Sequence, residues 1–125
     1  MLQLILLLTG LFGPPARPQG APPCQAKLHL SQEAQLLTLT GHCQSLLDQP
    51  ARYRYQLVVR RRGAGGQSQN TQGGEFALPA QQEATLSTVR LQVAPTDSYQ
   101  AQLLVFDAEN HIVAQDSASQ PGSPR

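Results

Sequence analysis

The sequence YRYQLVVRRRGAGGQSQNTQGG, at residues 53–74, decides the fold of this chain. Its first half alternates with a period of two residues, which is the side-chain period of a β-strand. The positions expected to face inward are Tyr53, Tyr55, Leu57 and Val59, and those expected to face water are Arg52, Arg54, Gln56, Val58, Arg60 and Arg62. Aromatic and β-branched residues gathered on one face are typical of a half-buried strand. We therefore expect a strand with one apolar and one cationic face.

A polar return strand completes a hairpin. Gly63, Gly65 and Gly66 can supply the positive φ angles that a turn requires. Ser68 to Gln72 reads as a second, wholly polar strand, and Gly73-Gly74 is expected to end it. The tip of this hairpin should be flexible.

The rest of the chain repeats short strands and turns. We expect strands at residues 26–30, 37–43, 76–78, 85–93, 99–105 and 112–116. The first two are joined by a turn at Ser31 to Gln35, and the last two by a turn at Asp107 to Asn110. Between Leu86 and Val89 the apolar positions slip by one residue, which predicts a bulge near Ser87-Thr88.

The number and spacing of these strands predict an immunoglobulin-like β-sandwich of about seven antiparallel strands. Asp97-x-Tyr99 stands where such folds place a tyrosine corner, in which the phenol hydroxyl bonds to upstream backbone. The cysteine that follows this tyrosine in antibody domains is replaced by Ala101, and the chain has no tryptophan. These two differences exclude an antibody-type core and leave the general sandwich.

The composition is that of one small globular domain with a local excess of positive charge. The chain has 125 residues, of which 40% are hydrophobic, and its three Phe and no Trp predict an aliphatic core. Its net charge is +1, but five of its nine Lys and Arg fall between Arg52 and Arg62. No acid occurs from Ala51 through Gly74.

The ends of the chain are interpreted as segments outside the domain. Residues 1–23 read as a signal peptide followed by a proline-rich linker, with a buried core helix as the alternative. Leu2 to Leu8 is too short to span a bilayer but long enough for a signal peptide, so no membrane segment should remain after cleavage. We expect the domain at 24–117 and a disordered tail at 118–125.

Cys24 and Cys43 flank the first hairpin. If Ser31 faces Leu36 across a four-residue loop, Cys24 faces Cys43 directly, with both side chains on one face. In an exported protein this geometry favours a disulfide, which would contribute about 3 kcal/mol. The alternative is a redox pair, but the Cys-x-x-Cys spacing and the neighbouring cations of reactive thiolates are missing.

The sequence has no recognisable catalytic or metal-binding pattern. His29, His42 and His111 lie on separate strands away from clustered carboxylates, so we interpret them as surface residues and expect no metal. No nucleophile elbow, phosphate loop or His-Glu-x-x-His motif occurs. The loop from Gly63 to Gly66 joins two strands and opens no helix, which argues against phosphate binding. We expect no enzyme activity and no cofactor.

The cationic face has a structural and a functional interpretation. Outward charges can simply prevent strands from pairing edge to edge. Nucleic acid is a poor partner, because the chain reads as exported and lacks outward aromatic residues among the arginines. If the arginine strand lies beside the strand from Tyr99, their outward side chains form an apolar strip bordered by arginines. Such a surface suits transient binding of an extended, acidic, amide-rich chain. The expected binding residues are Arg52, Arg54, Val58, Arg60, Arg62, Leu104 and Phe106.

The ordered set of motifs resembles the curli assembly protein CsgH family. The motifs are Tyr53-x-Tyr55, Val59-x-Arg61-Arg62-Gly63, Gly65-Gly66, Ser68, Thr71-Gln72-Gly73-Gly74, Phe76-x-Leu78, Asp97-x-Tyr99-x-Ala101, Asp107-Ala108 and Ala114-x-Asp116. The resemblance implies a periplasmic protein that delays amyloid formation by curlin, the curli subunit, without nucleotide or metal. We expect a monomer. The Cys-x-Cys of the related inhibitor CsgC is absent. The alternatives are an adhesive or carbohydrate-binding sandwich module and a disulfide-exchange domain.

Overall fold

The computed structural model describes residues 22–121, and every regular element in them is a β-strand. The signal peptide predicted from the sequence falls almost wholly outside these residues. The strands are β1 (Cys24–Glu33), β2 (Leu36–Ser45), β3 (Ala51–Gly63), β4 (Gly66–Leu78), β5 (Glu83–Gln92), β6 (Ser98–Phe106) and β7 (Ile112–Gln120). In this part of the chain no helix is long and apolar enough to cross a membrane.

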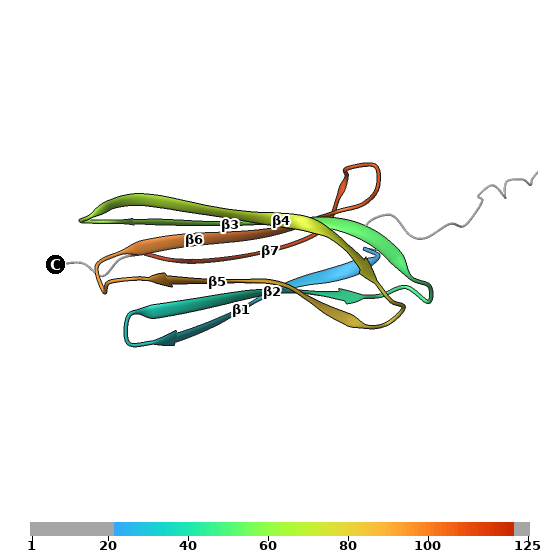
Figure 1. Ribbon diagram of the computed structural model, residues 1–125, viewed down its shortest axis with the longest axis horizontal. Coiled ribbons are helices and arrows are strands. Elements are labelled where there is room, and N and C mark those ends of the chain that lie inside the picture. The colour runs from blue at the N-terminus through green and yellow to red at the C-terminus, as the bar shows by residue number, and fades with distance from the viewer. Residues whose placement is uncertain (1–21, 122–125) are drawn as a thin grey trace, which may run out of the picture.

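The seven strands form two antiparallel sheets packed face to face (Figure 1). One sheet has the order β1-β2-β5, and the other has the order β4-β3-β6-β7. The predicted all-β sandwich is therefore confirmed. The expected pairing of the arginine strand β3 with β6 is also confirmed, from Arg54 opposite Phe106 to Arg62 opposite Ser98.

The core lies between the sheets and is mainly aliphatic. On β3 the predicted inward residues Tyr53, Leu57 and Val59 are buried and Tyr55 is half-buried. The buried side chains contributed by the other strands include Leu37, Leu39, Val89, Tyr99, Ala101, Leu103 and Val105. The alternation in the sequence thus follows burial, because successive side chains on a strand point to opposite faces.

Strand β4 is one continuous strand of 13 residues, so the predicted break at Gly73-Gly74 is wrong. Its register with β3 runs without interruption from Gly63 opposite Gly66 to Ala51 opposite Leu78. A Cβ atom on Gly73 would lie 2.9 Å from the carbonyl oxygen of Tyr55, and one on Gly74 would lie 3.6 Å from the Tyr55 ring. Glycine therefore permits a close approach of β4 to β3 here and does not end the strand.

The first hairpin is tighter than expected, and the prediction that Cys24 lies directly opposite Cys43 is wrong. Only Ala34 and Gln35 separate β1 from β2, and Ala34 adopts a left-handed φ of 54°. Strand β1 consequently extends into the predicted turn as far as Glu33, and the register shifts by two residues. Cys24 lies opposite Ser45, and Cys43 lies opposite Ala26. The two cysteines are diagonal neighbours on one face.

The predicted bulge is present, slightly earlier in the chain. Gly41 and His42 of β2 lie opposite Ser87 and Thr85, so Leu86 is the extra residue. Its carbonyl oxygen accepts a hydrogen bond from the Tyr55 hydroxyl, 3.2 Å away. At the other end of the chain β7 continues to Gln120, which pairs with Tyr99. The boundary expected at residue 117 is thus too early, and the end of the predicted tail lies outside the described residues.

Candidate binding face on the four-stranded sheet

The outer face of the four-stranded sheet carries the arginines that the sequence singled out. Because Leu57 and Val59 point into the core, the alternating positions of β3 point outward. We define the cationic stripe as the outward arginines Arg52, Arg54, Arg60 and Arg62. Glu75, opposite Arg54, is the single acid among the outward strand positions of this sheet in residues 22–121. The face is therefore strongly cationic although the whole chain is nearly neutral.

Three half-buried apolar side chains lie beside the stripe, and we define Val58, Leu104 and Phe106 as the apolar strip. Leu104 and Phe106 alternate along β6 on the same face. Leu104 lies opposite Gln56, two residues from Val58 along β3, which makes Val58 and Leu104 diagonal neighbours. The structure thus brings these residues onto one surface, as the sequence predicted.

Arg54 is held in place by neighbouring groups. Its guanidinium lies 4.3 Å from the centroid of the Phe106 ring, in a cation–π contact. It also donates a hydrogen bond to the side-chain oxygen of Asn110, in the turn after β6. Arg54 therefore joins the cationic stripe to the apolar strip, and it contributes to local packing as well as to charge.

The other arginines of the stripe are freer. Arg60 is exposed and donates from Nε to Oε1 of Gln69 on β4, at 3.0 Å. Arg52 and Arg62 are exposed and make no ion pair or side-chain hydrogen bond within the described residues. These two side chains, together with Arg60, are the cations most available to a partner.

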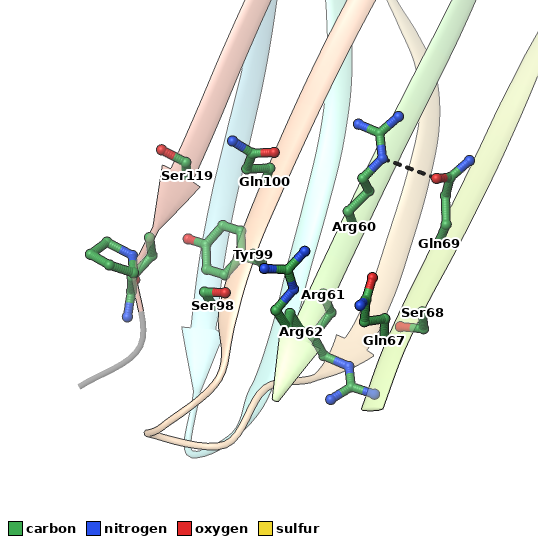
Figure 2. A pocket seen from close by; sticks show the side chains of 12 residues that line it. Arg60, Arg61, Arg62, Gln67, Ser68, Gln69, Ser98, Tyr99, Gln100 and Ser119 are labelled. Carbon is green, nitrogen blue, oxygen red and sulfur yellow. Dashed lines mark hydrogen bonds between the residues drawn. The ribbon is translucent and has the colours of Figure 1, made fainter. Parts of the chain in front are cut away.

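A shallow hollow of about 600 Å³ lies at the end of the sheet near the β3–β4 turn (Figure 2). Arginine, glutamine and serine side chains from all four strands line it, and Figure 2 shows Arg60 and Gln69 bonded across β3 and β4. The Tyr99 ring is buried, and its burial raises the pKa of the phenol. Amides, hydroxyls and cations suit a polar, anionic chain better than an apolar ligand.

The predicted tyrosine corner is built differently from the expectation. Tyr99 is the second residue of β6, near the strand's start as predicted, but its hydroxyl makes no hydrogen bond in the part of the chain that the structure describes. Asp97 closes the corner instead, because its Oδ2 accepts hydrogen bonds from the Ala94 backbone N–H at 2.9 Å and from Arg61 Nη1 at 3.1 Å.

The Arg61–Asp97 ion pair was not predicted from the sequence. The side chain of Asp97 is 8% exposed and that of Arg61 is 25% exposed, so the pair is largely withdrawn from water. The sequence feature that could have indicated this pair is the position of Arg61. It lies an even number of residues from the buried Leu57 and Val59, which places it on the inner face of β3. An inward arginine at the end of a strand requires an acidic partner.

The glycines of the β3–β4 turn have different roles. Gly66 has a φ of +115°, which favours glycine, whereas Gly63 and Gly65 have no such angle. Gly63 is restricted by space, because a Cβ atom there would overlap Asp97 Oδ1 at 1.8 Å. Nothing lies within 4 Å of a Cβ placed on Gly65. The expectation of positive φ is therefore correct for Gly66 and wrong for the other two.

Cys24 and Cys43 are free thiols in contact with each other on the inner side of the three-stranded sheet. They are 1% and 0% exposed. A hydrogen bond between the two thiols lowers the pKa of Cys24 and raises that of Cys43, and a hydrogen bond with Tyr53 lowers the pKa of Cys24 further. The two thiols therefore contact each other inside the core.

The histidines lie nearer to one another and to acids than expected. His29 and His42 pack edge to face with ring centroids 4.4 Å apart, and His42 Nδ1 lies 3.4 Å from Glu83 Oε2. His111 lies 3.5 Å from Asp107. Among residues 22–121 no group of three or more His, Cys, Asp or Glu is arranged to hold a metal ion.

The turn after β6 is where the sequence placed it. Asp107 Oδ1 accepts hydrogen bonds from the backbone N–H groups of Glu109 and His111, each at 2.9 Å. The hydrogen bond from the His111 backbone is the main reason that the pKa of Asp107 is lowered. This turn also carries Asn110, which binds Arg54, so it supports one end of the cationic stripe.

The fold and its basic outer face define a small immunoglobulin-like sandwich. Residues 22–117 match the family described as thin aggregative fimbriae synthesis protein, and the chain belongs to this family. No curated protein matches the chain at a significant level.

Solved structures support the same assignment. The E. coli curli protein CsgC is 26% identical, with a TM-score of 0.64 over 75% of this chain and 96% of that protein. CsgH of R. palustris is also 26% identical, with a TM-score of 0.58 over 75% of this chain and 89% of that protein. A β-glucuronidase of Bacteroides uniformis shares the fold alone, at 10% identity over 81% of this chain and 14% of that protein. The family match and the similarity to CsgC and CsgH support a role in curli biogenesis.

Proposed function

We propose that this protein is a periplasmic, non-enzymatic inhibitor of the CsgH type, which keeps a curlin-like subunit from premature amyloid assembly. The subunit would be held transiently on the outer face of the four-stranded sheet, and the protein would act as a monomer without a cofactor. The observation that carries the proposal is the composition of this face. Four outward arginines oppose one outward acid, and they border the apolar strip of Val58, Leu104 and Phe106.

Charge and apolar surface would act at different stages of binding. A cationic face raises the rate of encounter with an acidic chain, and added salt weakens this attraction. The apolar strip is small and half-buried, so it would lengthen the encounter without making a permanent complex. Transient contact suits a protein that must release its partner for export.

The structure gives no specific support to the two alternative functions. The similarity to glycosidase domains is a similarity of fold, which does not carry over a carbohydrate-binding site. A disulfide-exchange domain needs an accessible thiolate, whereas Cys24 and Cys43 are almost wholly buried. Inhibition through the outer face is therefore the function that the geometry favours.

A pair of charge-matched double variants tests the proposal. Arg60→Gln with Arg62→Gln removes two exposed cations from the stripe, and Lys27→Gln with Arg90→Gln removes two exposed cations from the other sheet. Both variants have the same net charge. We expect the first to shorten the lag of curlin fibrillation, measured by thioflavin fluorescence at substoichiometric inhibitor, and the second to inhibit like the wild type.

Salt provides an independent check on the same samples. Inhibition by the wild type should weaken as salt rises from about 0.05 to 0.3 M, because screening shortens the range of the attraction. The stripe variant should respond less to salt, and curlin without inhibitor is needed at every salt concentration. Equal inhibition by the two folded double variants at every salt concentration would contradict a role for the stripe.

A further inference from the structure

The strand edges of this sandwich are not equally protected. At β1, Asp116 of β7 accepts a hydrogen bond from the backbone N–H of Leu28, with Oδ2 2.8 Å from the nitrogen. At β5, the carbonyl of Leu86 is bound by the Tyr55 hydroxyl. Both edge strands of the three-stranded sheet thus have a backbone group that is bonded to a side chain of the four-stranded sheet. Within residues 22–121, no side chain bonds to the backbone of β4 between Gly66 and Gly74.

Strand β4 also lacks the features by which edge strands usually avoid pairing. It has 13 residues, an unbroken register with β3, no proline, and no charged residue from Gly66 to Gly74. Short length, bulges, proline and charge are the usual protections, because an edge presents unpaired N–H and C=O groups. From Gly66 to Thr71 the side chains on both faces are exposed. A further strand could therefore lie against this segment without displacing any part of the protein.

The side chains of β4 indicate which kind of strand would fit. Between the glycines the segment reads Gln67-Ser-Gln-Asn-Thr-Gln72, so amides project from both faces. Amides on adjacent strands can bond to one another in ladders, whereas an apolar strand would find no apolar surface here. Arg60 and Arg62 lie one strand away on the outer face, and Arg60 already bonds to Gln69. Acidic side chains on the added strand would lie toward these cations.

We propose that the exposed edge of β4, from Gly66 to Gly74, accepts a strand from an extended, amide-rich chain that carries acidic residues. The added strand becomes the fifth strand of this sheet. This proposal rests on the proposed function for its partner, the curlin-like subunit, and it adds the geometry of contact. A strand engaged in this way is sequestered from pairing with other subunits. A second copy of this protein fits less well, because two β4 edges would bring two arginine stripes together.

One substitution separates edge pairing from attraction by charge. Asn70→Lys places a lysine on the exposed edge, which hinders strand addition. It also adds a positive charge, so steering by charge alone predicts equal or stronger inhibition of an acidic chain. Edge pairing predicts loss of inhibition. Gln25→Lys, on edge strand β1 of the three-stranded sheet, adds the same charge at an exposed position away from the outer face and should inhibit like the wild type.

The direct measurement is backbone hydrogen exchange by nuclear magnetic resonance, with unpolymerised curlin added to the intact protein. We expect amides within Gly66–Gly74 to exchange more slowly when curlin is present, and Asn70→Lys to abolish this protection. Thr71→Lys serves as a second variant if Asn70→Lys does not fold. Protection that also appears without curlin, and that rises with protein concentration, would identify a second copy as the occupant and overturn the proposal.

The failure of this proposal can be distinguished from failure of the proposed function. If β4 shows no protection while the arginine double variant loses inhibition, edge addition is wrong and the inhibitor function stands. The opposite result is also possible: β4 is protected, Asn70→Lys removes the protection, and neither the wild type nor the variant changes the lag of fibrillation. Edge addition then stands and the inhibitor function is wrong.

Discussion

Arg60 and Arg61 are neighbours in the sequence but lie on opposite faces of the four-stranded sheet. Arg61 points inward, is partly buried and bonds to the carboxylate of Asp97. Arg60 points outward, is exposed and bonds to the neutral amide of Gln69. Arginine is thus a structural ion-pair partner on the inner face, at Arg61, and an available cation on the outer face, at Arg60.

The contrast between the two faces shows where the chain tolerates change. On the inner face, Gly63, Asp97 and Arg61 fit together within van der Waals distance, so a change in one disturbs the others. On the outer face Arg52, Arg60 and Arg62 are exposed, and a change in one of them disturbs little of the packing. We therefore expect inner substitutions to alter stability and outer substitutions to alter binding.

Gly63→Ala should produce the largest loss of stability. The added methyl group must displace Asp97 from a position 1.8 Å away, which strains the corner and weakens the bonds to Arg61 and Ala94. Overpacking together with lost hydrogen bonds should lower the free energy of unfolding by about 4 kcal/mol. Urea denaturation at equilibrium measures this difference.

Gly65→Ala is the matched control in the same turn. A Cβ at Gly65 meets nothing within 4 Å, and its φ is not in the left-handed region. Its stability should stay within about 0.5 kcal/mol of the wild type. If both alanine variants were equally stable, the restriction at Gly63 would be disproved.

The faces also differ in how far the sequence could predict them. Period-two alternation identified the inner face of β3 correctly, because burial selects apolar side chains at every second position. The continuity of β4 was missed, since Gly73-Gly74 reads as a break unless Tyr55 is known to lie opposite. The register of the first hairpin was missed for a similar reason. It depends on a left-handed Ala34, and alanine gives no signal for that conformation.

The candidate site shows the same division. The outward arginines and the apolar strip could be predicted, because they need only strand parity and the adjacency of β3 and β6. The inward position of Arg61 could be predicted in the same way, but its partner could not, because Asp97 is 36 positions away and lies outside the strands. The cation–π contact of Arg54 with Phe106 likewise depends on their direct cross-strand pairing.

Oxidation of the buried cysteines should have the next largest effect. We predict that Cys24 and Cys43 form a disulfide in exported protein, because their thiols are already in contact. In the chain-entropy model a bridge closing a loop of this size raises the free energy of unfolding by about 3 kcal/mol. The mass of the protein measured by mass spectrometry should rise on reduction by that of two hydrogen atoms, one for each thiol formed. Free thiols in folded protein isolated from an oxidising compartment would exclude the bridge.

Neutralising one acid on each face should change stability least, and it compares the two faces most directly. Asp97→Asn keeps the shape of the buried side chain but weakens its charge-assisted bond to Arg61 and leaves that cation unpaired. We expect a loss of about 2 kcal/mol in the free energy of unfolding. Glu75→Gln removes an equal charge from an exposed outer position and should cost less than about 0.5 kcal/mol.

In inhibition of curlin the order of the two variants should be reversed, so that Glu75→Gln has an effect and Asp97→Asn has none. Glu75→Gln removes the single outward acid from the strands of the cationic face in the described part of the chain, so it should strengthen inhibition of curlin. Asp97→Asn leaves the outer charges unchanged and should inhibit like the wild type at temperatures where it remains folded. Urea denaturation and thioflavin lag times, measured on the same preparations, test both halves of this expectation. Equal stability of the two variants would show that the ion pair of the inner face contributes no more than an exposed charge.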